Sequence, residues 1–343
     1  MRKSNHATNL RGFVEQESNV VFGIVSIHDV FSRHRMKNIA VIGGGTMGNG
    51  IVHVFAQNGF QVALIDVKKE ILDKALATIQ KNMDRQVAKG SLTEEQKQEA
   101  LARISVFTTI SDGVENADLV IEAATENVDI KLNIFRQLDG LTREHCILAS
   151  NTSSISITKI GSVTNRPEKV IGMHFMNPVP IMKLVEIIGG YKTSAETTDT
   201  IVELTKKIGK VPAFTNDYPG FISNRVLLPM INEAILSLEQ GVAGVEEIDT
   251  IMKLGMAHPM GPLQLADFIG LDVCLAILNV LQDGFKNPKY APSNLLINMV
   301  TAGDLGVKSG RGFYDYSHGT KDLVVAPGFS KKQNEVSGQG MAS

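Results

Sequence analysis

Short apolar runs alternate with stretches of helical apolar spacing over the first part of the chain. The runs predict buried strands at 37–42, 62–66, 119–122, 147–149, 170–174 and 184–188. Residues 69–89 predict a long helix, because their apolar side chains recur at helical spacing at Ile71, Ala75, Ile79 and Met83. Thr93 and Gln96 have the spacing of a capping box and predict a further helix. Strands alternating with helices predict a doubly wound α/β sheet of the Rossmann type.

The pattern changes after about Asn216. No further strand is predicted there, and helices dominate from 222 to 299. Pro219 and Gly220 mark the junction between the two patterns, since both residues interrupt regular structure. We therefore expect a Rossmann-type doubly wound sheet followed by an all-α C-terminal domain.

These patterns divide the chain into four segments. We expect a dinucleotide-binding domain at 36–216, a helical domain for dimerisation and substrate binding at 217–317, and a loose tail at 318–343. Residues 1–35 fit neither pattern, and we interpret them as a disordered extension with Met36 as the natural start. A targeting peptide is the alternative for this segment, although it lacks a charged region followed by an apolar core and a cleavage site.

Composition narrows the class of protein. The chain has 343 residues, of which 43% are hydrophobic and 20% charged, which suits a globular protein of two domains. Its formal net charge of -2 gives no support for a nucleic-acid partner. No apolar run is long enough to predict a membrane span. Cys146 and Cys274 cannot form a disulfide framework, so we expect buried free thiols in a reducing compartment, the cytoplasm.

A glycine-rich turn follows the first predicted strand. Gly43, Gly45 and Gly48 form G-x-G-x-x-G before a predicted helix at 47–55. The first glycine permits a tight turn, the second lets backbone approach a pyrophosphate, and the third allows close packing of helix on strand. The free N–H groups of the helix N-terminus then attract the phosphates. Because strand, turn and helix agree, the motif predicts a dinucleotide site.

Asp66 ends the second predicted strand, 18 residues after Gly48. A carboxylate at this position can accept hydrogen bonds from ribose hydroxyls and repels a 2′-phosphate, which favours NAD over NADP. Lys68 and Lys69 weaken this exclusion slightly. The alternative is that Asp66 caps the following helix.

His174 and Glu186 are candidates for proton transfer. His174 ends a predicted strand, where an imidazole can take and return a proton near neutral pH. Glu186 lies within an apolar run, where an unpaired carboxylate is costly to bury. A His–Glu pair accounts for both residues, since the carboxylate orients the ring and stabilises its protonated form. A core histidine with an ordinary structural partner is the alternative.

Five ordered motifs resemble one family. They are Gly-Gly-Gly-Thr-Met-Gly at 43–48, Ser-Asn-Thr-Ser-Ser at 150–154, His-Phe-Met-Asn-Pro at 174–178, Pro-Gly-Phe-Ile-Ser-Asn-Arg at 219–225 and His-Pro-Met-Gly-Pro-Leu at 258–263. Their order and spacing resemble the short-chain 3-hydroxyacyl-CoA dehydrogenases, which include the bacterial 3-hydroxybutyryl-CoA dehydrogenases. The resemblance runs from about residue 36 to residue 316.

The resemblance implies an activity and a set of catalytic residues. The implied reaction is NAD-dependent interconversion of an (S)-3-hydroxyacyl-CoA, such as 3-hydroxybutyryl-CoA, and its 3-oxoacyl-CoA. His174 would act as base in oxidation and as acid in reduction, paired with Glu186. Ser153 and Asn224 would hydrogen-bond the substrate oxygens or the histidine, although Asn224 could equally cap a helix.

The resemblance also implies binding residues. The implied cofactor contacts, besides the three glycines and Asp66, are Thr46, Met47, Glu126, Lys131, Ser153 and Asn177, the last near the nicotinamide. Asn82 and Lys89 would contact the coenzyme A part, but Asn82 stands where some relatives have serine, which puts this contact in doubt. Met176 replaces a phenylalanine of many members. No histidine and carboxylate set has the spacing of metal ligands.

The same resemblance implies a homodimer built through the C-terminal helices. The apolar stretch 268–281 agrees with a dimer face, and core packing explains it equally well.

Three alternatives remain. A dehydrogenase of a free hydroxy acid, of the L-gulonate type, looks similar in the cofactor half, but the context of His174 and the pair Asn82 and Lys89 favour a thioester. A non-catalytic crystallin-like protein would be expected to have lost the catalytic residues, which are Ser153, His174, Glu186 and Asn224. A role within a multifunctional fatty-acid oxidation system would need a separate chain, since there is no room here for a fused hydratase.

Overall fold

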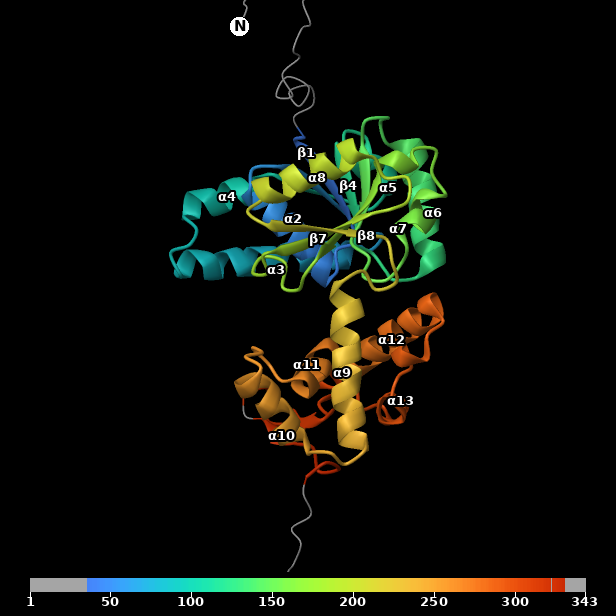
Figure 1. Ribbon diagram of the computed structural model, residues 1–343. Helices are drawn as coiled ribbons and strands as arrows, with labels where there is room; N and C mark the ends of the chain where they lie inside the picture. The colour runs from blue at the N-terminus through green and yellow to red at the C-terminus, as the bar shows by residue number, and fades with distance from the viewer. Residues whose placement is uncertain (1–35, 322, 331–343) are drawn as a thin grey trace, which may run out of the picture. The chain divides into compact units, whose positions relative to one another are not determined.

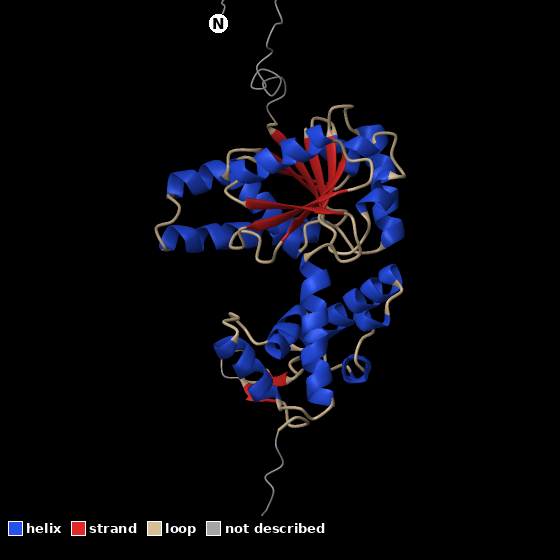
Figure 2. Ribbon diagram, in the orientation of Figure 1, coloured by secondary structure: helices blue, strands red, loops and turns tan. Residues whose placement is uncertain are grey.

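A computed structural model describes residues 36–321 and 323–330, so the predictions made for 1–35 and 331–343 lie outside the described residues. One eight-stranded sheet organises the first part of the chain, in the order β3-β2-β1-β4-β5-β6-β7-β8 (Figure 2). The strands are β1 (Asn38–Ile42), β2 (Gln61–Ile65), β3 (Ile104–Phe107), β4 (Leu119–Glu122), β5 (Ile147–Ser150), β6 (Val170–Phe175), β7 (Leu184–Gly189) and β8 (Val211–Asn216). All neighbouring strands are parallel except β6 and β7, which are antiparallel.

Helices follow most of these strands and cover the sheet (Figure 1). They are α2 (Thr46–Gln57), α3 (Lys69–Ala88), α4 (Glu94–Ala102), α5 (Ile110–Val114), α6 (Val128–Leu141), α7 (Ile157–Gly161) and α8 (Ala195–Lys207). The strand order reverses between β1 and β4, so the turns after these two strands meet at the switch point where such sheets bind ligands. The predicted Rossmann-type sheet is therefore confirmed.

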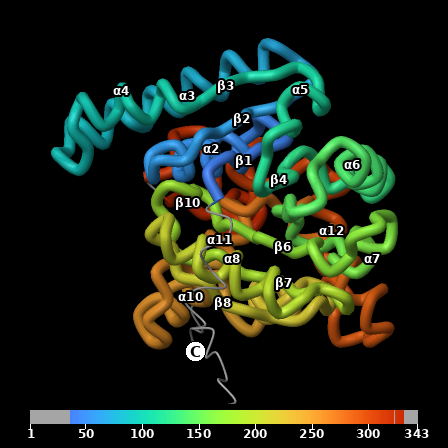
Figure 3. The backbone as a smooth tube through the Cα atoms, turned by 90° about the horizontal axis from the view of Figure 1, so that it is seen from above, coloured from blue at the N-terminus to red at the C-terminus, as the bar shows by residue number. Residues whose placement is uncertain are grey.

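The long helix after β2 has the apolar face that its sequence predicts. Ala75, Ile79 and Met83 of α3 are buried, and Thr93 with Gln96 forms the predicted capping box of α4. Lys97 of α4 lies 2.7 Å from Asp84 of α3 and joins the two helices. Figures 1 and 3 show them side by side, projecting from the sheet.

Two strands of this sheet were not predicted, and both lie at its edges. β3 and β8 have few buried positions, and β8 contains Pro212. An edge strand has a partner on one side only and needs no continuous apolar run, so its sequence signal is weak.

The second part of the described chain is mainly helical. Its helices are α9 (Ser223–Glu239), α10 (Val245–Thr250), α11 (Pro262–Ile269), α12 (Leu271–Phe285) and α13 (Asn294–Ala302). Their inward side chains form one apolar core, which includes Ile231, Leu263, Cys274, Leu278 and Leu296.

A short antiparallel pair interrupts the all-α pattern. β9 (Tyr314–Asp315) pairs with β10 (Val324–Val325), and Ala326 is buried beside them. The sequence predicted neither strand, because two-residue strands leave no periodicity, and it assigned β10 to a loose tail.

Within residues 36–321 and 323–330, no single helix is both long and apolar enough to cross a membrane. The helices α11 and α12 meet those criteria only when taken together, as a pair bent by 97°.

Candidate active site

The glycine turn between β1 and α2 fits a pyrophosphate. Gly43 has φ +104°, and a Cβ added there would lie 2.6 Å from the carbonyl oxygen of Ala123. A Cβ on Gly48 would lie 1.7 Å from the carbonyl oxygen of Gly43, so no larger residue fits. Gly45, by contrast, faces open space, and α2 begins at Thr46 without a side-chain cap. Its first N–H groups are therefore available to an anion.

Asp66 lies directly after β2 and beside this turn. Its Oδ2 accepts a hydrogen bond from the amide of Gly44 at 2.9 Å, and its Oδ1 accepts one from Lys68 at 3.2 Å. The amide of Lys68 precedes α3, so this is a turn contact rather than a cap of the first helical turn. Each oxygen has a second lone pair, which leaves capacity for ribose hydroxyls.

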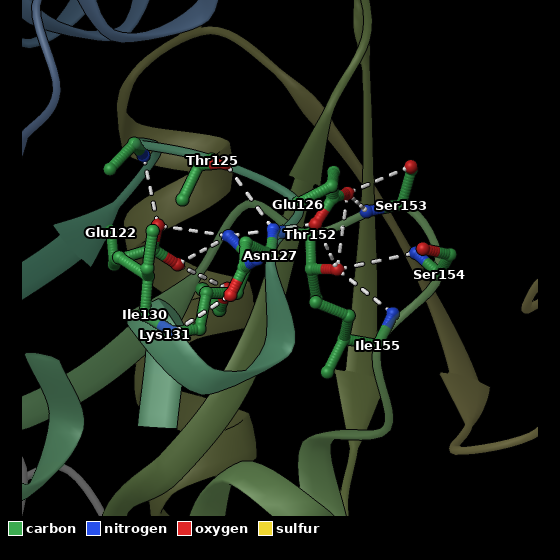
Figure 4. A network of polar contacts seen from close by, with 12 residues as sticks. Glu122, Thr125, Glu126, Asn127, Ile130, Lys131, Thr152, Ser153, Ser154 and Ile155 are labelled. Atoms are coloured by element: carbon green, nitrogen blue, oxygen red, sulfur yellow. Dashed lines mark hydrogen bonds and ion pairs between the residues drawn. The ribbon is translucent and has the colours of Figure 1, made fainter. Parts of the chain in front are cut away.

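A buried ion pair joins the end of β4 to helix α6 (Figure 4). Lys131 Nζ lies 2.6 and 2.9 Å from the two carboxylate oxygens of Glu122, and the side chains are 2% and 0% exposed. Glu122 also accepts hydrogen bonds from Ser150 Oγ and the amide of Ala124, both at 2.8 Å. Full hydrogen bonding offsets part of the cost of burying both charges. Sequence reasoning missed Glu122, although a carboxylate ending an apolar strand is a visible signal.

Glu126 continues this network toward the surface (Figure 4). It accepts hydrogen bonds from the amide of Ser153 at 2.6 Å, from Ser153 Oγ at 2.9 Å and from Thr152 Oγ1 at 2.9 Å. Lys131 Nζ lies 3.6 Å from it. Glu126 is exposed, whereas the ammonium of Lys131 is enclosed by the two glutamates. This geometry supports a direct cofactor contact for Glu126 and an indirect one for Lys131.

His174 and Glu186 lie directly opposite each other in the antiparallel pair β6–β7. His174 Nδ1 is 3.0 Å from Glu186 Oε2, and the two residues are 9% and 3% exposed. Because an ionised carboxylate only accepts, Nδ1 carries the proton, which leaves Nε2 free to act on a substrate. The structure thus brings His174 into contact with Glu186, the carboxylate that would be costly to bury without a partner.

Glu186 has further partners at the start of α9. Its Oε1 accepts hydrogen bonds from the amides of Ile222 at 2.8 Å and Ser223 at 3.2 Å, and its Oε2 accepts one from Ser223 Oγ at 2.8 Å. Burial by itself would raise the pKa of Glu186, but the bonds from His174, Ile222 and Ser223 outweigh it and hold the pKa below its usual value. Sequence reasoning missed Ser223, because a contact between β7 and α9 leaves no local pattern.

The other two predicted catalytic residues, Ser153 and Asn224, lie on the turn after β5 and in the first turn of α9, and Asn177, predicted to lie near the nicotinamide, follows β6. Asn224 is buried, and its Nδ2 donates to the carbonyl oxygen of Ser153 at 3.0 Å. The Ser153 hydroxyl donates to Glu126 rather than to His174. Asn177 is exposed, at a cis Asn177–Pro178 bond. The structure therefore brings Ser153 and Asn224 together.

Asn151 was not predicted as a site residue. Its Oδ1 accepts a hydrogen bond from the amide of Phe175 at 2.9 Å, which fixes the backbone next to His174. The serine-rich turn after β5 thereby supports the end of β6.

The other residues expected to contact the cofactor or coenzyme A lie on α2 and α3. Thr46 is exposed and Met47 half-buried, both in the first turn of α2. Asn82 is half-buried on α3, where its Oδ1 accepts a bond from Arg85 at 3.4 Å, and Lys89 is exposed at the C-cap of α3. In the described residues, no contact joins Asn82 or Lys89 to the His174 pair.

Comparison with known proteins agrees with this geometry. Residues 38–218 match the 3-hydroxyacyl-CoA dehydrogenase NAD binding domain, and residues 220–316 match the C-terminal domain of the same family. A probable 3-hydroxybutyryl-CoA dehydrogenase of Bacillus subtilis is 53% identical over 83% of this chain and 99% of its own length. The human mitochondrial hydroxyacyl-coenzyme A dehydrogenase is 42% identical over 82% of this chain and 91% of its own.

A solved structure is similar throughout the fold. The (S)-3-hydroxybutyryl-CoA dehydrogenase of Ralstonia eutropha is 50% identical with a TM-score of 0.81, covering 82% of this chain and 100% of its own. Together the two domain matches and these relatives cover most of the chain. The chain is thus an NAD-dependent dehydrogenase that belongs to the 3-hydroxyacyl-CoA dehydrogenase family.

Proposed function

We propose that the chain interconverts (S)-3-hydroxybutyryl-CoA and its 3-oxoacyl-CoA, with His174 and Glu186 as the acid–base pair. The observation that carries this proposal is the 3.0 Å contact between His174 Nδ1 and Glu186 Oε2. It leaves one imidazole nitrogen free at the carboxyl end of β6, which lies at the same edge of the sheet as the glycine turn after β1. The names of the similar enzymes support a short 3-hydroxyacyl thioester as substrate.

His174 moves the proton of the reaction. When bound, NAD accepts the hydride that leaves C3 of the substrate. Nε2 of His174 removes the proton of the C3 hydroxyl, and Nδ1 keeps its hydrogen bond to Glu186, whose charge stabilises the imidazolium. In the reverse direction the same nitrogen returns the proton. Acid–base catalysis of this kind contributes roughly 10²–10⁴-fold to the rate.

The remaining residues bind and orient. The glycine turn would hold the pyrophosphate, with Thr46 and Met47 at the start of α2, and Asp66 would hold a ribose and repel a 2′-phosphate. Glu126 would contact the cofactor, Asn177 would lie on its nicotinamide side, and Lys131 would hold Glu126. The contacts of Gly44 and Lys68 with Asp66 support its role, because they orient the carboxylate.

The substrate is oriented by a second set. Ser153 and Asn224 would hydrogen-bond its oxygens, which their mutual contact supports. Asn82 and Lys89, at the end of α3, would contact the coenzyme A part. A free hydroxy acid would have no need of these two residues, so the thioester is the favoured substrate.

We also propose a cytoplasmic homodimer with the domain boundary at 216/217. The family matches at 38–218 and 220–316 support that boundary. Within the predicted dimer stretch 268–281, Leu271, Leu278 and other residues are buried in the core, while Phe268 and Val273 remain exposed for a partner. Neither a membrane nor a nucleic acid enters the proposal.

The test is NADH oxidation with acetoacetyl-CoA, run beside free acetoacetate and beside NADPH. Turnover of the thioester with NADH only is expected. Turnover of the free acid alone would show instead a dehydrogenase of a free hydroxy acid. No turnover of either compound would favour a non-catalytic, crystallin-like protein.

A further inference from the structure

The segment between β6 and β7 connects the two members of the proton-handling pair. It spans residues 176–183 and carries the exposed Asn177. The carbonyl oxygen of Pro178 accepts hydrogen bonds from the amides of Ile181 at 2.9 Å and Met182 at 3.0 Å, which closes the segment into a turn. We call residues 176–183 the connecting turn. Its shape decides where Asn177 lies.

A buried lysine from another part of the chain holds this turn. Lys210, between α8 and β8, is 8% exposed. Its ammonium donates to the carbonyl oxygens of Val179 at 2.5 Å and Met182 at 2.6 Å. No carboxylate within ion-pair distance of Lys210 occurs in the part of the chain that the structure describes. Burial lowers the pKa of Lys210, as expected for an ammonium without a counter-ion.

An apolar side chain could not do the same. The two carbonyl groups belong to irregular backbone and point at one atom, and an ammonium offers three donors from a single centre. An apolar side chain of equal length would leave the buried carbonyl group of Val179 and the part-buried one of Met182 without this donor, which is costly. The lysine therefore fixes two points of the turn at once.

The connecting turn also touches the cofactor helix. A Cβ added to Gly50 of α2 would lie 2.8 Å from Val179 Cβ, so helix and turn are in close contact. On its N-terminal side, the amide of Phe175 is bound by Asn151. The turn is thus fixed by Asn151 before it, by α2 against Val179, and by Lys210 at its two carbonyl groups.

We propose that Lys210 is a positioning residue for the reaction: it fixes the connecting turn so that Asn177 and the His174–Glu186 pair keep their places relative to the cofactor helix. The inference rests on the function proposed above. Lys210 touches neither reacting atoms nor cofactor and acts through the backbone of Val179 and Met182.

The test compares Lys210→Met with Lys206→Met and Lys210→Arg. Lys206 is exposed and, among the described residues, forms an ion pair with Glu203 on the same helix, so it controls for loss of a lysine. In NADH-dependent reduction of acetoacetyl-CoA, kcat per folded enzyme is expected to fall about 10- to 100-fold in Lys210→Met, as for a small misplacement of reacting groups. Lys206→Met keeps the wild-type kcat, and Lys210→Arg, which retains charged donors, regains part of the loss. Wild-type kcat in folded Lys210→Met would overturn the inference.

Hydrogen exchange gives a readout that needs no turnover. Peptides covering residues 176–183 should exchange faster in Lys210→Met than in wild type or Lys206→Met, because the amides of Ile181 and Met182 lie in the released turn. Unchanged exchange there, or a loss of stability shared with all other peptides, would overturn the positioning role. If wild type itself turns over no thioester, the proposed function fails, while this exchange result still decides the role of Lys210.

Discussion

The carboxylate of Glu186 lies 2.8 Å from the backbone amide of Ile222, the residue that precedes α9. The same carboxylate binds His174 through its other oxygen. One side chain of the sheet therefore orients the imidazole and satisfies the N-terminus of the first helix of the second domain. Substitutions at this position are expected to affect both stability and catalysis, and the two effects must be measured separately.

The substitution His174→Gln should nearly abolish turnover. Glutamine can hydrogen-bond but cannot exchange a proton near neutral pH, so kcat is expected to fall roughly 10²–10⁴-fold. Since the glycine turn and Asp66 are untouched, the NADH dissociation constant, measured by fluorescence titration, should stay close to wild type. Retained turnover would contradict the assignment of His174 as the base.

Glu186→Gln should lower both the rate and the apparent pKa of the pH–rate profile. The carboxylate stabilises the imidazolium that forms during the reaction, and glutamine keeps the shape of the side chain without its charge. Ser223→Ala is the matched control, because it removes one hydrogen bond to Glu186 and leaves the charge beside His174. An unaltered profile in Glu186→Gln would show that the pair does not act in catalysis. Urea denaturation of both variants separates the loss of stability from the loss of rate.

Gly45→Ala should weaken cofactor binding without unfolding the protein. A Cβ at this position meets no protein atom within 4 Å, so the added methyl group points where the phosphates are expected. The NADH dissociation constant should rise about tenfold or more, while the melting temperature stays near wild type. Gly48→Ala is the comparison, since its Cβ would lie 1.7 Å from the carbonyl oxygen of Gly43 and should destabilise the fold itself. Wild-type NADH affinity in Gly45→Ala would contradict the placement of the pyrophosphate.

The helical domain should lose stability as pH rises through the titration of Asp267. Burial raises the pKa of Asp267 to about 6, despite hydrogen bonds from the amides of Tyr314 and Phe313 and from the Tyr316 hydroxyl. The folded state therefore binds this proton more tightly than the unfolded state. The contribution is fully present below about pH 4 and is lost as the pH rises to about 6, by on the order of 3 kcal/mol.

The measurement is urea denaturation of wild type and Asp267→Asn across this pH range. Asparagine loses hydrogen-bond acceptors at every pH, so the variant should be less stable throughout. The difference in the free energy of unfolding between wild type and the variant should shrink as pH rises, because only wild type loses stability when Asp267 ionises. A deficit that is constant with pH would mean that Asp267 keeps an ordinary pKa.

The parts of the fold that the sequence predicted are those specified locally. The turn at Gly43 and Gly48 depends on the residues of one β–α–β unit, and the capping box at Thr93 lies within four residues. The pairing of His174 with Glu186 followed from the cost of burying an unpaired carboxylate in an apolar run.

The contacts that escaped prediction join distant segments. Lys210 reaches Val179, and Glu186 reaches Ile222. Nothing in the local pattern of either segment specifies its partner. The edge strands β3 and β8 were not predicted for a different reason. They have too few buried positions to produce an apolar pattern in the sequence.

The antiparallel pair β6–β7 carries both proton-handling residues on one continuous hairpin, 174–186, whereas the glycine turn for the cofactor, 43–48, follows β1. Both residues of the acid–base pair thus lie in a single continuous segment of the chain. Cofactor preference and proton chemistry can be altered separately, by exchanging one segment while the other keeps its sequence. A chimaera that takes this hairpin from a relative, together with the lysine that anchors it, should inherit the donor's pH–rate profile and the recipient's choice of dinucleotide.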